Sequence, residues 1–132
     1  NIGRHQSKLV RTKVCSTRSP WLRKASVGQI LTVPISHGEG RFVANTNDID
    51  TMLENGQILT QYVDFEGNPT MDIRFNPNGS TMAIEGILSP DGRILGKMGH
   101  SERIGKGLYK NVPGEFELGM FESAVSYFRC EE

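Results

Sequence analysis

The feature that most constrains the fold is a short apolar run at residues 29–35, followed at once by a glycine-rich segment at 36–41. The run is short and rich in β-branched side chains, which favours a buried strand. The proline at position 34 predicts that this strand stops pairing near Ile35. Open α/β sheets bind ligands in loops at the carboxyl ends of strands. We therefore expect an α/β fold with this strand in the sheet interior and a ligand-binding loop at 36–40.

A second strong signal is an Asp-Gly pair at 91–92, between stretches of strand-forming residues at 81–88 and 93–98. Asp-Gly is a preferred turn of β-hairpins, so these stretches are predicted to pair with each other. The hairpin leads directly to His100 and Glu102. Residues i and i+2 of an extended backbone point to the same face, so the two side chains are expected to lie together. Because both loops follow strand ends, we also expect His100 to lie near residues 36–40.

An imidazole beside a carboxylate forms two thirds of a nucleophilic triad. The carboxylate fixes the tautomer of the histidine and stabilises the imidazolium that forms when the ring accepts a proton. The third member, an activated cysteine or serine, is not evident. Cys15 lies within a predicted strand, where a free cysteine usually acts as a small core residue, and Cys130 lies beside two glutamates that oppose thiolate formation. Neither cysteine has the flanking glycines of a nucleophile elbow.

The remaining segments complete an α/β pattern in a chain of 132 residues, which is expected to form a single domain over 1–132. Strands are predicted at 7–17 and 57–63, and helices at 48–55 and 118–128. The apolar residues of the second helix recur at helical spacing, so we expect its buried face to carry Met120, Phe121, Val125 and Phe128.

Charge and composition narrow the choice of partner. The formal net charge is zero, and no apolar run is long enough to cross a membrane. Residues 1–38 hold seven Lys or Arg and no acid, whereas residues 39–132 hold eight against fifteen acids. Aromatic residues are not interleaved with this basic segment, which favours a solvated strand face over a nucleic-acid site. Two cysteines outside any disulfide framework, and no secretory pattern, favour a cytoplasmic protein.

Five segments, read in order, resemble the glutaminase region of the phosphoribosylformylglycinamidine synthases, amidotransferases of purine biosynthesis. They are residues 34–42, 67–69, 76–80, 84–87 and 92–103. The resemblance covers nearly the whole chain, and residues 120–123 are similar to the end of the large single-chain form. It implies the C-terminal portion of a class I glutamine amidotransferase domain. That fold is α/β and flavodoxin-like, an open twisted sheet with flanking helices and a β-hairpin.

The glutaminase site of that family is a Cys-His-Glu triad. The resemblance implies that His100 and Glu102 are catalytic and that the nucleophilic cysteine belongs to a preceding half of the domain, so this chain alone is expected to be inactive. It also implies a glutamine-binding segment made of Ser36, His37 and Gly38. The implied partners are glutamine, the nucleophile-bearing half and the synthase domain. No metal or cofactor is expected in this chain, because ATP and magnesium belong to the synthase domain.

One departure from the family pattern concerns the loop around the histidine. Many members have prolines on both sides of it, where this chain has Gly99 and Ser101. Such changes alter the stiffness of the loop rather than its catalytic groups.

Two other classes of function stay open. His37 with Glu39, and His100 with Glu102, form two His-x-Glu units that could together bind zinc or iron. Alternatively, the basic N-terminal segment could make the chain a non-catalytic binding module for an acidic partner. A metal assay and retention on heparin separate these hypotheses from the amidotransferase interpretation.

Overall fold

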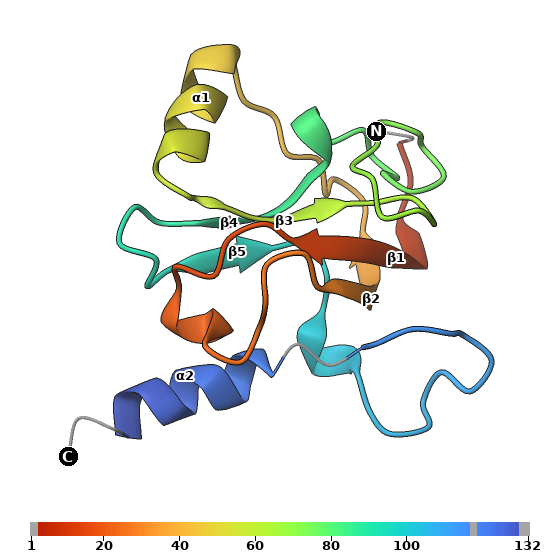
Figure 1. Cartoon of the computed structure of the whole chain (residues 1–132). Helices are drawn as coiled ribbons and strands as arrows, with labels where there is room; N and C mark the ends of the chain where they lie inside the picture. The colour runs from red at the N-terminus through yellow and green to blue at the C-terminus, as the bar shows by residue number, and fades with distance from the viewer. Residues whose placement is uncertain (1–2, 117–118, 130–132) are drawn as a thin grey trace.

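The computed structural model describes residues 3–116 and 119–129. Its centre is an open five-stranded sheet with the order β2-β1-β3-β4-β5 (Figure 1). The strands are β1 (Gln6–Val14), β2 (Ile30–His37), β3 (Ile58–Tyr62), β4 (Ile84–Leu88) and β5 (Leu95–Lys97). All pairings in this described sheet are antiparallel, and β4 and β5 form the predicted hairpin. The predicted α/β class with an open sheet is confirmed.

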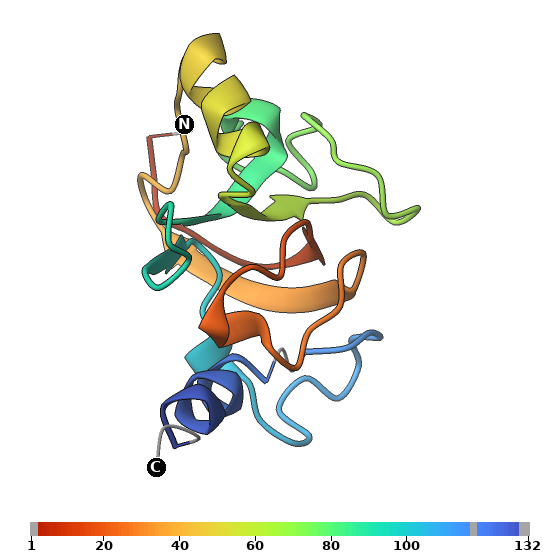
Figure 2. The ribbon, with the colours of Figure 1, turned by 60° about the vertical axis from the view of Figure 1, so that its left-hand side comes forward.

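Two helices lie on opposite sides of the sheet. Helix α1 (Thr46–Glu54) and helix α2 (Met120–Arg129) are separated by the strands in both views (Figure 1, Figure 2). Helix α1 begins where the side chain of Asn45 accepts the backbone N–H of Asp48 at 2.9 Å, as expected of an N-cap residue. The described residues also form the short 3-10 helices η1 (Pro20–Leu22), η2 (Thr81–Ala83) and η3 (Ser101–Arg103). The last of these contains the predicted catalytic glutamate.

Among the described residues, buried apolar side chains form two core clusters, and β2 contributes to both. One cluster, packed by η1 and α2, contains Val14, Leu22, Leu31, Leu59, Leu88 and Met120. The other contains Val10, Val33, Ile35, Tyr62 and Ala83. Each fully buried Val, Leu, Ile or Met side chain in these clusters contributes about 1.5–3 kcal/mol. The position of β2 is therefore fixed along its length.

The location of β2 corrects one expectation. It lies at the edge of the described sheet, so the prediction of an interior strand is wrong. Residues 31–35 are buried nonetheless, because other parts of the chain cover the outer edge. The N–H of Thr32 donates to the carbonyl of Glu115 at 2.7 Å, and the N–H of His100 donates to the carbonyl of Pro34 at 2.8 Å. Pairing with β1 also continues to His37, beyond the predicted end at Ile35.

The orientation of α2 corrects a second expectation, which concerned the buried face of this helix. Met120 is buried as predicted, together with Ser123 and Ala124, but the other predicted core residues are about half exposed or more: Phe121, Val125 and Phe128. The hydroxyl of Ser123 accepts the backbone N–H of Lys24 at 3.1 Å, which turns the Ser123 side of the helix toward η1. Position 118 of the predicted helix lies outside the described residues.

Basic side chains of the N-terminal segment are bound within the fold. Lys8 donates to the carbonyl of Arg74 at 2.9 Å, and Lys13 donates to the carbonyl of Gly67 at 2.9 Å. These contacts favour the solvated strand face over an arm that binds an acidic partner. The described part of the chain contains no helix long and apolar enough to span a membrane.

Candidate active site

The side chains of His100 and Glu102 are in direct contact. Nδ1 of His100 lies 2.6 Å from Oε1 of Glu102, so the predicted juxtaposition is confirmed. The predicted backbone is wrong, because His100 caps the 3-10 helix η3 and Glu102 lies within its single turn. A tight turn, rather than an extended strand, brings the two groups together. The pair lies at the surface, with His100 29% and Glu102 57% exposed.

The contact lowers the pKa of Glu102 and sets which ring nitrogen of His100 carries the hydrogen. The hydrogen bond from His100 lowers the pKa of Glu102, with smaller contributions from a backbone hydrogen bond and from nearby positive charge. An ionised Glu102 accepts the proton of Nδ1, which leaves the lone pair of the neutral ring on Nε2. Nε2 is then the atom that can accept a proton from a nucleophile.

The backbone that presents His100 is bound on both sides. The N–H of Met98 donates to the carbonyl of Glu85 at 3.1 Å, and the N–H of His100 donates to the carbonyl of Pro34 at 2.8 Å. Between them, the N–H of Gly99 donates to the carboxylate of Glu85 at 2.5 Å. Three successive N–H groups thus attach the histidine loop to β4 and β2.

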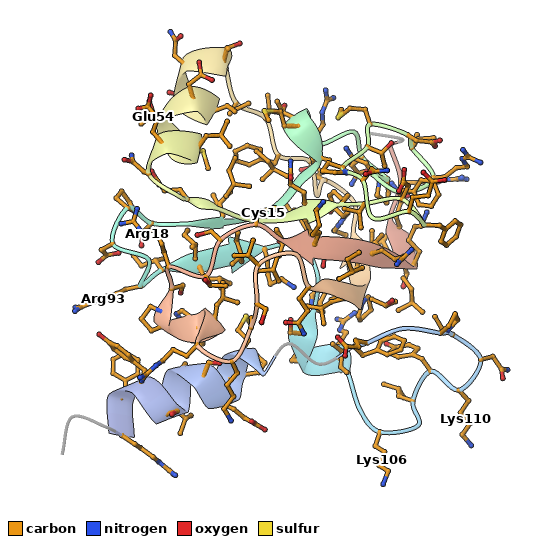
Figure 3. The ribbon with its side chains drawn as sticks, in the orientation of Figure 1. Cys15, Arg18, Glu54, Arg93, Lys106 and Lys110 are labelled. Atoms are coloured by element: carbon orange, nitrogen blue, oxygen red, sulfur yellow. The ribbon has the colours of Figure 1, made fainter. Side chains whose placement is uncertain are left out.

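His100 and His37 line the same open cavity, whose volume is about 470 Å³. This confirms that the histidine loop lies near the glycine-rich segment. A larger hollow of about 840 Å³ adjoins it and shares Ser101, Glu102 and Met120. Its wall includes Lys106, on the long loop that also carries Lys110 and runs from η3 toward α2 (Figure 3). The His–Glu pair is therefore accessible from an extended depression.

Ser36, His37 and Gly38 do not all face this depression. Of the three, His37 is the one found among the residues that line the smaller cavity. Adjacent strand residues point to opposite faces, and the hydroxyl of Ser36 is instead hydrogen-bonded to Nε2 of His5 at 3.0 Å. Gly38 follows the last strand residue, and the space where its side chain would lie is open.

The environment of His37 favours a neutral ring. Burial lowers its pKa, and the nearby imidazoles of His5 and His100 act in the same direction. Nδ1 accepts a hydrogen bond from the side-chain amide of Asn78 at 3.1 Å, which places the ring proton on Nε2. That Nε2 is buried without a hydrogen-bond partner among the described residues.

Cys15 belongs to a different part of the molecule. It lines a small cavity with Met52 and Gln61, and none of the residues lining that cavity lines the one at His100. Burial raises the pKa of its thiol, which donates to Oε1 of Gln61 at 3.3 Å. Figure 3 shows it at the sheet, away from the loop of Lys106. These features are those of a structural cysteine. Cys130 lies outside the described residues.

The alternative metal site does not assemble in the described part of the chain. No group of three or more His, Cys, Asp or Glu side chains there is arranged to bind an ion. Glu39, one of the four ligands that the hypothesis requires, is exposed.

Three residues around the site were missed by the sequence analysis: Asn78, Glu85 and Lys97. A usable signal existed for Glu85, because a glutamate interrupts an otherwise apolar strand at 84–88. Its counter-ion Lys97 lies on β5 and pairs with Gly86, the residue that follows Glu85 on β4. Asn78 gave no signal beyond its membership in a turn.

Comparisons with known proteins show what this chain is similar to. Residues 1–128 match the family model for the CobB/CobQ-like glutamine amidotransferase domain. The phosphoribosylformylglycinamidine synthase subunit PurQ of Thermomicrobium roseum is 41% identical over 91 residues, 69% of this chain and 38% of that protein. The same subunit of Chlorobaculum tepidum is 33% identical over 128 residues, 96% of this chain and 53% of that protein.

A solved structure is also similar to this fold. The structure of PurLQS from Thermotoga maritima superposes with a TM-score of 0.67 and 25% identity, covering 96% of this chain and 49% of the other. The chain thus spans about half the length, or less, of the relatives that it matches.

Proposed function

Because the chain belongs to the CobB/CobQ-like glutamine amidotransferase family, we propose that it supplies the histidine and glutamate of a glutaminase site in a phosphoribosylformylglycinamidine synthase. The observation that carries this proposal is the 2.6 Å contact between His100 and Glu102, at a cavity that His37 also lines. The relatives named above are separate PurQ subunits. We assign the chain to the large single-chain form on the resemblance of residues 120–123 to the end of that form.

In the proposed mechanism, Nε2 of His100 accepts the thiol proton of a cysteine carried by the other half of the glutaminase domain. The thiolate attacks the carboxamide carbon of glutamine, and the imidazolium returns the proton to the departing nitrogen, which leaves as ammonia. Water then attacks the resulting thioester, with His100 again as the base, and releases glutamate. Glu102 stabilises the imidazolium in both steps and holds Nδ1 in its protonated form.

Glutamine binding is assigned to Ser36, His37 and Gly38. The ring of His37 borders the cavity although its Nε2 is buried, and the open space at Gly38 allows a ligand to approach the backbone. Since the hydroxyl of Ser36 is engaged by His5, we assign Ser36 a contribution through its backbone.

The ammonia is proposed to act in the synthase part of the parent enzyme. There ATP, held with magnesium, would phosphorylate the formyl amide oxygen of formylglycinamide ribonucleotide, and ammonia would displace that oxygen as phosphate to give the amidine. Those ligands belong to the synthase part, and we propose that this chain alone does not turn over glutamine. A cytoplasmic location is proposed from the free thiol of Cys15 and the metabolic role of the relatives.

The test compares two nitrogen donors in the full-length enzyme. His100→Ala and Glu102→Gln are expected to reduce glutamine-dependent amidine formation by about a thousandfold or more, while ammonia-dependent formation continues. Glu54→Gln, on the exposed surface of α1, is the matched control and should leave both rates unchanged. Equal losses with both donors would assign these residues to structure, and unimpaired use of glutamine would exclude them from catalysis.

A further inference from the structure

A buried ion pair lies next to the histidine loop. Glu85 on β4 and Lys97 at the end of β5 have side chains that are 0% and 8% exposed, and Nζ of Lys97 lies 3.6 Å from Oε1 of Glu85. Removing two charges from water is costly, and the cost is offset only where further hydrogen bonds satisfy both groups. The groups that are hydrogen-bonded to Glu85 and Lys97 therefore indicate the structural role of the ion pair.

Both members of the pair contact the loop that carries the histidine. Oε1 of Glu85 accepts the backbone N–H of Gly99 at 2.5 Å, and Nζ of Lys97 donates to the hydroxyl of Ser101 at 3.3 Å. The second carboxylate oxygen of Glu85 accepts the hydroxyl of Thr60, which is buried on β3. The pair thus binds the residue before His100 and the residue after it.

The approach of Gly99 to this carboxylate leaves no room for a side chain. A Cβ at this position would lie 2.7 Å from both γ-carbons of Val33 and 2.9 Å from Oε1 of Glu85. The glycine also retains the N–H that the carboxylate accepts, which a proline would lack. The residues on either side of His100, Gly99 and Ser101, are therefore both held by the ion pair.

We propose that Glu85 is a positioning residue for His100, with Lys97 as its buried counter-ion. The carboxylate fixes the backbone N–H of Gly99 and thereby the direction in which the next residue presents its imidazole. This inference rests on the proposed glutaminase function, in which the orientation of the base determines the rate of the chemical step. Displacement of a reacting group by about 1 Å can lower a rate about a hundredfold.

The test uses Glu85→Ala and Glu85→Gln in the full-length enzyme, assayed well below the unfolding temperature. For Glu85→Ala, the kcat with glutamine is expected to fall by about ten- to a hundredfold, while the KM for glutamine changes by less than about threefold. The ammonia-dependent rate should not change. Glu85→Gln retains an oxygen that can accept the N–H of Gly99, so its kcat is expected within about fivefold of the wild-type value.

Val14→Ala controls for a loss of stability, since Val14 belongs to a different core cluster from Val33, the residue beside Gly99. It is expected to lower Tm and to leave kcat unchanged. The proposal is overturned if Glu85→Ala retains its kcat, if Glu85→Gln is as impaired as Glu85→Ala, or if kcat in the three variants simply follows Tm. His100→Ala in the same assay separates a failure of the positioning role of Glu85 from a failure of the glutaminase proposal. Glutamine use by that variant would reject the glutaminase proposal itself, whereas an inactive His100→Ala beside a fully active Glu85→Ala would reject only the positioning role.

Discussion

The backbone N–H of His100 donates a hydrogen bond to the carbonyl oxygen of Pro34, 2.8 Å away. This bond joins the outer edge of β2 to the histidine loop. Because proline has no N–H, the strand presents only an acceptor at this position, and the loop supplies the matching donor. The side chain of Val33 fills the space beside Gly99 in the same region. The most apolar strand and the His–Glu pair are therefore parts of one structural unit, and a change that moves β2 should also move His100.

Removal of Lys97 is predicted to destabilise the domain. Lys97→Met leaves the carboxylate of Glu85 buried without its counter-ion, which costs about 3 kcal/mol of unfolding free energy. Denaturant unfolding, followed by a signal from this domain, measures the change. Lys24→Met is a matched control, because its ion pair with Glu122 is 53% and 62% exposed and should contribute less than about 1 kcal/mol. Similar small losses in both variants would contradict the prediction.

The hydrogen bond from His100 is predicted to control the titration of Glu102. Since that bond lowers the pKa of Glu102, His100→Ala should raise it toward its ordinary value. Because the pKa of Glu102 is lower in the folded state, its ionisation stabilises the fold at pH values above the pKa of an ordinary glutamate. This stabilisation is lost as the pH falls through the lowered pKa. A ¹³C NMR titration of the side-chain carboxyls measures the shift. Asp72, whose pKa is held at about 2 by Arg74, should not respond.

Local sequence signals predicted the main strands and helices and the β4–β5 hairpin, but not the order of the strands in the sheet. The Asp-Gly turn identified a hairpin and the β-branched run identified a strand, because turn chemistry and strand propensity act over a few residues. The edge position of β2 depends on pairing with residues distant in the sequence, and no local pattern encodes that order. For α2, the apolar spacing correctly predicted a helix but not its buried face. The contact of Ser123 with Lys24 determines which side of the helix faces η1.

In the candidate site, too, local spacing was predictable from the sequence, whereas contacts between distant segments were not. The spacing of His100 and Glu102 predicted their contact, although a 3-10 turn and not an extended strand produces it. The family resemblance placed Ser36 and His37 in one binding segment, whereas their side chains have different surroundings. The role of Glu85 was not predicted because it depends on the counter-ion Lys97, and the pairing of β4 with β5 brings these two residues together.

Cys15 is predicted to be dispensable for glutamine use. Because burial raises the pKa of its thiol, the thiolate fraction at neutral pH is smaller than for an exposed cysteine, and alkylation should be slow. Iodoacetamide labelling with peptide mapping measures that rate in the folded and the urea-unfolded protein. In the full-length enzyme, Cys15→Ser should retain glutamine-dependent activity. Rapid labelling of folded Cys15, with loss of that activity, would assign it a role in catalysis.

Gly40 is predicted to hold the ring of His37 in place. A Cβ at position 40 would collide with three atoms of that ring, so Gly40→Ala must displace it from the cavity shared with His100. If His37 binds glutamine, both Gly40→Ala and His37→Ala should raise the KM for glutamine, by about tenfold for the loss of one hydrogen bond of roughly 1.4 kcal/mol.

The double variant then decides whether the two changes act through the same group. Gly40→Ala combined with His37→Ala should raise the KM no more than either single change, because residues that act through one contact are not additive. Gly105→Ala, where an added Cβ meets nothing within 4 Å, is the control and should leave the KM unchanged. Steady-state kinetics with glutamine as the donor measure all four variants. Additive effects would show that Gly40 serves the loop by itself, and an unchanged KM in His37→Ala would remove the imidazole from substrate binding and leave that role to the backbone of the segment.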